Sequence, residues 1–132
     1  MRRHPSFARE EGQAAAEMAL VLPILAALLL AIAQFGMLFN NYITLTDATR
    51  AGARKAAISR FIGDSGASAV TAVRASASNL DQTKLAVSVT SSNWTVPGSD
   101  VTVTATYPFS VSILGWTVKS GTLTSTTKER LE

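Results

Sequence analysis

The hydrophobic pattern of the chain is dominated by one long apolar run near the N-terminus. No Asp, Glu, Lys or Arg occurs from Met18 to Thr46, and Met18–Phe39 is almost wholly hydrophobic. An α-helix that rises about 1.5 Å per residue needs roughly 20 such residues to cross about 30 Å of hydrocarbon. Met18–Phe39 supplies 22 residues. We therefore predict one membrane-spanning helix over residues 18–39.

The helix is predicted to continue well beyond the apolar run, so that residues 13–61 form one element. Small or apolar residues recur at helical spacing in its second half: Leu45, Ala48, Gly52 and Ala56. This spacing is typical of a helix that is apolar on one face only, whereas the first half is apolar all round. The second half therefore has a face that can cover another element.

The remaining residues, 67–132, have the pattern of a small α+β domain. Two glycines break the helix near residue 63, and a second helix with one apolar face is predicted over 67–80. Apolar and polar residues then alternate over 85–89 and 101–107, which indicates two strands, with Pro97-Gly98 marking the loop between them. Residues 110–116 fit a loop or a short strand, and 122–128 a threonine-rich edge strand. The predicted fold class is α+β: a long N-terminal helix, a short helix and a small antiparallel sheet.

The polar residues before the run have a distinctive spacing. Gly12 ends a charged leader, residues 1–12, which is predicted to be disordered, and Glu17 stands five residues after Gly12 at the mouth of the apolar run. A short polar leader, a glycine and a glutamate at this distance resemble the start of type IV pilins. Pilin leaders usually carry basic residues just before the glycine, whereas this chain has Glu10 and Glu11 there.

Longer segments narrow the resemblance to TadE-like proteins, minor pseudopilins of tight-adherence (Tad/Flp) systems. The similar stretches are Gly12–Pro23, Gln34-Phe35-Gly36 and Asp47–Arg54, with a Ser/Thr-rich β-region and the charged tail Lys128–Arg130 after them. Flp major pilins start similarly but are much shorter, which favours a minor subunit. The resemblance implies a structural subunit that aids pilus assembly and surface adhesion. It also implies other pilin and pseudopilin subunits, a prepilin peptidase and the inner-membrane Tad assembly platform as partners.

The resemblance gives Gly12, Gln13 and Glu17 their expected roles. A prepilin peptidase would cut between Gly12 and Gln13, and the new α-ammonium of Gln13 would be mostly charged at pH 7 because its reference pKa is about 7.7–8.0. In an apolar filament core, Glu17 of one subunit could neutralise the N-terminus of its neighbour. The alternative is an ordinary boundary acid, which costs little at a helix mouth and favours its positive end.

Three further residues are candidates for helix packing. Pro23 removes a backbone donor inside the span and should kink or loosen the helix there. Gln34 is polar inside the span, so it either needs a partner from another helix or lies near enough to the surface to be hydrated. Gly52 costs about 1 kcal/mol relative to alanine in mid-helix, which suggests close packing against another backbone.

Two arginines and two tryptophans each have a functional interpretation, as a binding surface, and a purely structural one. Arg50 and Arg54, four apart on one helix face, could contact lipid phosphates or acids of a partner, although a solvated face is the simpler alternative. Trp94 and Trp116 are predicted to pack in the small core or under loops rather than to form a binding surface. Asn93-Trp94-Thr95 fits a glycosylation acceptor pattern, which we attribute to chance in so Ser/Thr-rich a chain.

Composition argues against an enzyme. The chain has no cysteine and one histidine, His4, which falls in the leader. No catalytic triad, phosphate-binding glycine loop or metal-ligand spacing is present, so we expect no cofactor, no metal and no small-molecule substrate. The net charge of +3 is too weak and scattered to indicate nucleic acid.

Two rival interpretations of the apolar run remain open. Ala31-Ile32-Ala33 fits a signal-peptidase site, which would release a small secreted binding domain starting at Gln34. An uncleaved signal anchor carrying a scaffold domain is the other. Basic residues flank both ends of the span, so charge does not orient it. The pilin resemblance implies a single-pass protein of the bacterial inner membrane, with residues 67–132 exported to the periplasm or cell surface, or held in a pilus.

Overall fold

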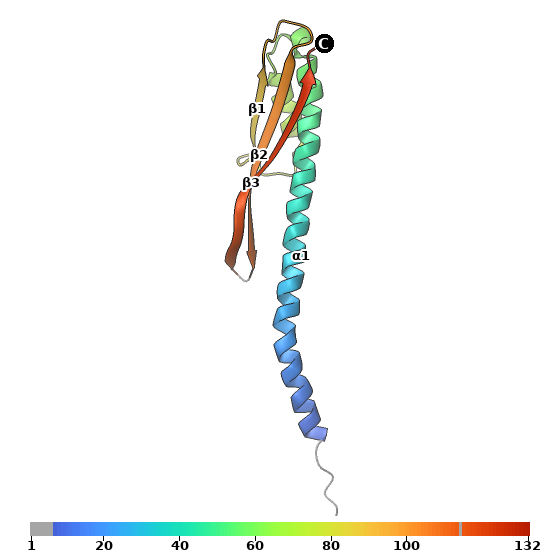
Figure 1. Ribbon diagram of the computed structural model, residues 1–132, viewed down its shortest axis with the longest axis vertical. Helices are drawn as coiled ribbons and strands as arrows, with labels where there is room; N and C mark the ends of the chain where they lie inside the picture. The colour runs from blue at the N-terminus through green and yellow to red at the C-terminus, as the bar shows by residue number, and fades with distance from the viewer. Residues whose placement is uncertain (1–6, 114) are drawn as a thin grey trace, which may run out of the picture.

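A long helix carries a small sheet domain against its C-terminal half (Figure 1). The computed structural model describes residues 7–113 and 115–132. The long helix is α1 (Phe7–Ala57), followed by a single turn of helix, α2 (Ser59–Ile62), and by α3 (Ala67–Ser76). The strands β1 (Ala86–Ser91), β2 (Asp100–Ile113) and β3 (Trp116–Arg130) form an antiparallel sheet in the order β1-β2-β3. The predicted α+β class is confirmed.

The ends of α1 differ from the prediction. The helix begins at Phe7, so the expectation of a disordered leader is wrong for residues 7–12; residues 1–6, with His4, lie outside the described part. Residue types with high helix propensity, such as alanine at position 8, can extend an existing helix, because extension does not incur the free-energy cost of nucleation. At the other end α1 stops at Ala57, and a turn separates it from α2. There the Ser59 hydroxyl donates to the Ala56 carbonyl (2.7 Å), a local bond that competes with the helical ladder.

The predicted break after the long helix is confirmed. Gly63 (φ +72°) and Gly66 (φ +90°) both take left-handed backbone conformations that favour glycine. Between them, the Asp64 carboxylate accepts hydrogen bonds from the Gly66 and Ser68 amides at 3.0 and 2.8 Å, so it caps the first turn of α3. The helix itself is shorter than predicted, because residues 77–80 form a turn whose carbonyls accept from the Gln82 side chain.

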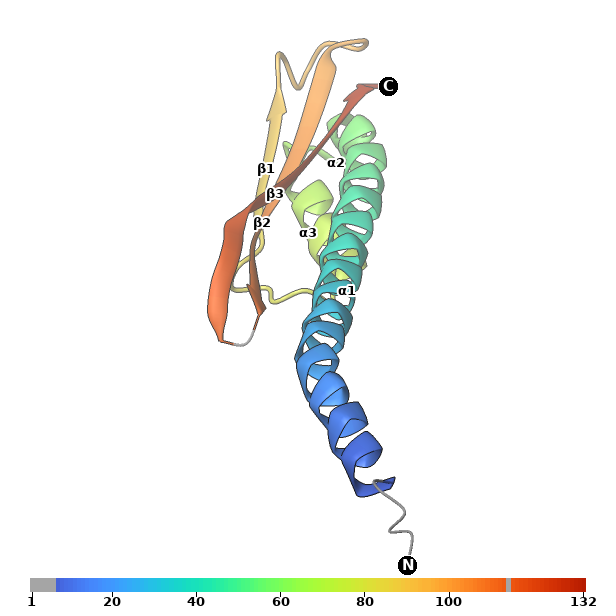
Figure 2. The ribbon, with the colours of Figure 1, turned by 60° about the horizontal axis from the view of Figure 1, so that its bottom comes forward.

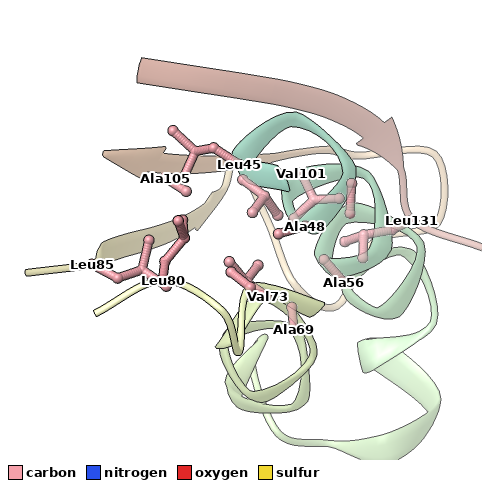
Figure 3. Packing of buried hydrophobic residues seen from close by; sticks show 13 residues of the cluster. Leu45, Ala48, Ala56, Ala69, Val73, Leu80, Leu85, Val101, Ala105 and Leu131 are labelled. Carbon is pink, nitrogen blue, oxygen red and sulfur yellow. The ribbon is translucent and has the colours of Figure 1, made fainter. Parts of the chain in front are cut away.

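The core lies between the sheet and the two helices α1 and α3 (Figure 2). Figure 3 shows side chains from the sheet, α1 and α3 pointing toward one another. The predicted small-sided face of α1 is buried here, since Leu45, Ala48 and Ala56 are wholly inaccessible. The other members of the cluster come from α1, α3, the following turn, the sheet and the C-terminus: Ala53, Ala69, Val73, Ala77, Leu80, Leu85, Val101, Val103, Ala105 and Leu131. Residues 67–132 therefore share their core with α1.

A buried hydroxyl cluster joins α1 to β3. Thr49 Oγ1 lies 2.9 Å from Ser125 Oγ and accepts from Thr127 Oγ1 at 3.2 Å, while it donates to the Thr46 carbonyl at 2.8 Å. Thr49 is wholly buried and Ser125 nearly so, and these bonds satisfy polar groups that would otherwise be costly to bury.

Ion pairs at the far end of the sheet tie the ends of two strands together. Lys128 Nζ lies 2.8 Å from Asp100 Oδ2, and Arg130 Nε lies 3.9 Å from Asp100 Oδ1. The hydrogen bond from Lys128, and then the charge of both bases, holds the pKa of Asp100 below its usual range. The contribution of this group to folding is therefore present at neutral pH and is lost as the pH falls through the lowered pKa.

The sheet is longer than the sequence pattern indicated. β2 continues through residues 108–113, turns back near Gly115 (φ +85°), and pairs with β3 over its whole length. Residues 110–113 are strand, and β3 begins at Trp116 rather than near residue 122. One irregularity interrupts this pairing: Ser112 faces Thr117 while Val111 faces Lys119, so Val118 is an extra residue in β3.

Candidate functional site

The residues singled out at the N-terminal end lie on one exposed stretch of α1. Gly12, Gln13 and Glu17 are all exposed. Gln13 Nε2 donates to Glu17 Oε1 at 3.1 Å, the spacing expected for side chains four apart on a helix. Within the described chain Glu17 therefore has only this neutral partner for its carboxylate, at the point where the charged residues end.

Gly12 has no packing role in the described structure. A Cβ placed on it would meet nothing within 4 Å, and its φ is not in the left-handed region. A glycine in mid-helix costs about 1 kcal/mol relative to alanine. Gly12 therefore weakens the helix, and no packing contact of the described subunit requires it. The bond between Gly12 and Gln13 is thus both exposed and easier to unwind than its surroundings.

The apolar run behind Glu17 is exposed on every side. Within the described residues, α1 is the one helix that is long and apolar enough to cross a membrane, and its most apolar stretch has no buried residue. Its exposed large side chains include Met18, Leu20, Val21, Leu22, Ile24, Leu25, Leu28, Leu29, Leu30 and Ile32. Such a surface is unsuited to water and fits a single-pass membrane anchor. Pro23 lies exposed within this stretch, and α1 runs through it without a break.

Gln34 is bound to the sheet rather than to another helix. Its Nε2 donates to the Ser112 carbonyl at 2.5 Å, and its Oε1 accepts from the Ser112 amide at 3.1 Å. The Gln34 amide therefore makes the two hydrogen bonds to Ser112 that a neighbouring strand would otherwise make. Ser112 lies next to the irregularity in the pairing of β2 with β3. Sequence reasoning expected Gln34 to bind another helix or water, and it missed the backbone of Ser112 as the partner.

Gly52 lies where α1 packs against α3. A Cβ on Gly52 would be 3.2 Å from the Ala69 carbonyl oxygen, 3.4 Å from Val103 Cγ1, and closer still to Val73 Cγ2. The absent side chain is therefore needed for the two helix backbones to approach. Unlike Gly12, this glycine has an evident structural reason inside the subunit.

Arg50 and Arg54 are exposed on the outer side of α1. Arg50 Nη1 lies 3.4 Å from Asp47 Oδ1, with both side chains about two-thirds exposed, so the pair is a surface ion pair of little energetic weight. The structure brings neither arginine near Glu17 or Gln34; the sites named from sequence are spread along α1.

The two tryptophans have opposite environments. Trp94 packs against the core beside Gly66 and Val89, as predicted. The prediction for Trp116 is wrong, because its side chain is 83% exposed at the end of the β2–β3 hairpin. The alternation of Val111 and Ile113 before Gly115, and of Trp116 and Val118 after it, was the signal for a hairpin here. It was obscured by Pro108 and by the serines and threonines between.

Among residues 7–113 and 115–132, no three His, Cys, Asp or Glu side chains gather in a way that could hold a metal ion.

One family comparison bears on this geometry. The family described as TadE-like protein matches residues 12–54, the segment that begins at Gly12 and ends beside Gly52. Over this segment, about a third of its length, the chain is similar to TadE-like proteins. Searches among curated proteins and among solved structures found no match.

Proposed function

We propose that this TadE-like chain is a minor pilin or pseudopilin of a Tad pilus, cut by a prepilin peptidase between Gly12 and Gln13. The observation that carries the proposal is the place of the family match: it starts at Gly12 and covers Glu17 and the whole exposed apolar stretch of α1. Gly12 has no packing role in the subunit, which supports a role in recognition by a peptidase.

Processing would change the partners of Glu17. Cleavage would make Gln13 the first residue and place a charged α-ammonium at the start of an apolar helix. Assembly of such helices into a bundle would remove both charges from water, and a buried charge needs an opposite charge close by. Glu17, whose present partner is a neutral amide, would then pair with the N-terminus of a neighbouring subunit and fix the axial register.

The membrane, other pilin subunits and the inner-membrane Tad assembly platform are the partners of this function. Before assembly, α1 would hold the subunit in the inner membrane with the sheet domain exported. After processing, the subunit would aid pilus assembly and thereby surface adhesion. Arg50 and Arg54, which lie exposed beyond the apolar stretch, would face lipid headgroups or acids of a neighbouring subunit.

A secreted domain that starts at Gln34 is the second candidate. Its support is that α1 contacts the hairpin from Gln34 onward, so cleavage after Ala33 would keep the Gln34–Ser112 pairing and the core contacts of Leu45 and Ala48. The family match argues against it, because half of the matched segment would be lost.

Substitution of Gly12 tests the proposal. In cells that assemble Tad pili, Gly12→Val should leave a membrane-bound precursor that keeps its first twelve residues, because a branched side chain would obstruct the peptidase at the scissile bond. Gly36→Val is the matched control, since Gly36 is also helical and exposed with nothing within 4 Å of an added Cβ. The control should be processed normally. An unchanged mature N-terminus in Gly12→Val would contradict the proposal.

A further inference from the structure

The end of the β2–β3 hairpin is an apolar surface with no cover in the described structure. Trp116 is 83% exposed and Val118 64%, and Ile113 lies opposite Trp116 in the last pair of the hairpin. No charged residue occurs from Val101 to Val118. We refer to residues 113 and 115–118 as the hairpin end. Its exposed tryptophan and valine are unfavourable in water, so we expect this surface to bind a partner.

From the sheet domain, the hairpin runs in the direction of the N-terminal, apolar part of α1 (Figure 1). Its position along the helix is fixed by the two hydrogen bonds between the Gln34 side chain and the Ser112 backbone. A groove between the two elements is lined on the helix by Gln34, Met37, Leu38 and Asn41 and on the strand by residues 107–111. The hairpin end lies past Ser112, by about 3.3 Å for each further residue of strand.

The length of the apolar helix gives the depth of this contact in a membrane. The 16 residues from Met18 to Ala33 span about 24 Å, which is less than the roughly 30 Å of a hydrocarbon core. A span that begins after Glu17 must therefore include Gln34 and the residue or two of the next turn that line the groove. Because the hairpin runs past Ser112 toward the N-terminal end of α1, its end then lies several Å inside the level where α1 leaves the hydrocarbon.

We propose that the hairpin end inserts into the bilayer at the border between headgroups and acyl chains, in the leaflet on the side of the sheet domain. The proposal rests on α1 being a membrane anchor, and it adds a second membrane contact far away in sequence. Trp116 suits this border, because an indole has an apolar body and one polar N–H, and tryptophan is enriched at membrane interfaces. Lys119 follows at once on the side toward the domain, where its ammonium can reach lipid phosphates.

The Gln34 pairing takes on a further role in this arrangement. An amide side chain inside an apolar helix would be unfavourable in lipid if its polar atoms had no partner. Both atoms of the Gln34 amide are satisfied by Ser112, and the same bonds satisfy the Ser112 backbone at the irregular point of the hairpin. Gln34 thus acts as a positioning residue that sets the hairpin depth against the anchor.

Fluorescence quenching by brominated lipids tests the proposal on the full chain in liposomes of phosphatidylcholine and phosphatidylglycerol. Trp94→Phe leaves Trp116 as the one tryptophan, and Trp116→Phe leaves Trp94. Brominated lipids in both leaflets make the result independent of orientation. Trp116 should lose roughly half its emission, most strongly with bromines near the headgroup end of the chains, as expected for an interfacial tryptophan. Trp94, which packs against Gly66 in the sheet domain, should be unaffected.

The outcomes separate this inference from the function proposed above. If the protein resists alkaline extraction but Trp116 is not quenched, the anchor stands and the inference is overturned. If alkali extracts the protein, the membrane anchor itself is wrong and the inference falls with it. If Trp116 is protected only at high protein-to-lipid ratios and cross-links to a second copy, the hairpin end binds another subunit, which also overturns the inference. Circular dichroism of both variants confirms that they are folded.

Discussion

Glu17→Ala is expected to abolish incorporation of the protein into pilus complexes while leaving it inserted, processed and normally abundant. Removal of a charge from the helix mouth does not hinder insertion. Glu17 is exposed, and among the described residues its side chain hydrogen-bonds only to Gln13, so folding should not change. In an assembled bundle, however, the α-ammonium of a neighbour would lose its counter-charge. Breaking a buried pair in this way costs about 3–5 kcal/mol, and even the lower figure weakens association by roughly a hundredfold.

Co-purification with pilus subunits and counts of pili per cell measure this effect. Asp47→Ala is the matched control, because Asp47 is also an exposed acid on α1 but lies beyond the apolar run and forms a surface ion pair with Arg50. Its effect on assembly should be small. Normal piliation in Glu17→Ala would mean that Glu17 is an ordinary boundary acid with no role in assembly.

Gly52→Val is expected to destabilise the sheet domain more than any exposed substitution on α1. A Cβ alone would press on Val73 and on the Ala69 carbonyl, and the two methyl groups of valine have no space between α1 and α3. Overpacking of this kind costs about 1–3 kcal/mol and at times more. We therefore expect a loss of about 3 kcal/mol in the free energy of unfolding, and a melting temperature lower by roughly 10 °C or more.

The melting of the full chain in detergent, followed by the fluorescence of Trp94 in a Trp116→Phe background, measures this loss. Gly36→Val again serves as the control, since valine there enters open space. It should leave the melting temperature nearly unchanged. Equal stability of Gly52→Val and the parent chain would show that α1 is only a stalk and that the Gly52 face is free for contacts with other subunits.

Structural features that depend on residues close together in the chain were predictable from the sequence. The long helix, its buried face at Leu45, Ala48 and Ala56, the break near Gly63 and the central strand all follow from periodicity or from glycine conformation. The length of the β2–β3 hairpin could not be predicted from the sequence. Pro108 and Gly115 interrupt the alternation of apolar and polar residues, and many positions of the hairpin are threonine or serine. Strand pairing supplied the order that local pattern lacked.

The candidate site divides in the same way. Gly12 and Glu17 form a local motif, and they could be named because their spacing resembles the start of type IV pilins. The structure adds that a Cβ on Gly12 would meet nothing within 4 Å. The Gln34–Ser112 pairing joins residues 78 apart in the chain, and neither residue type indicates the other. Likewise the exposure of Trp116 depends on where the hairpin ends. Such long-range juxtapositions come from the fold as a whole.

The mass of the mature protein purified from membranes of its native host tests the central claim most directly. Cleavage by a prepilin peptidase predicts that the chain begins at Gln13, and tandem mass spectrometry of the N-terminal peptide identifies that residue. A chain that begins at Met1 would make α1 an uncleaved signal anchor. A chain that begins at Gln34 would make residues 1–33 a secretory signal and the rest a secreted domain, and either result would contradict the account.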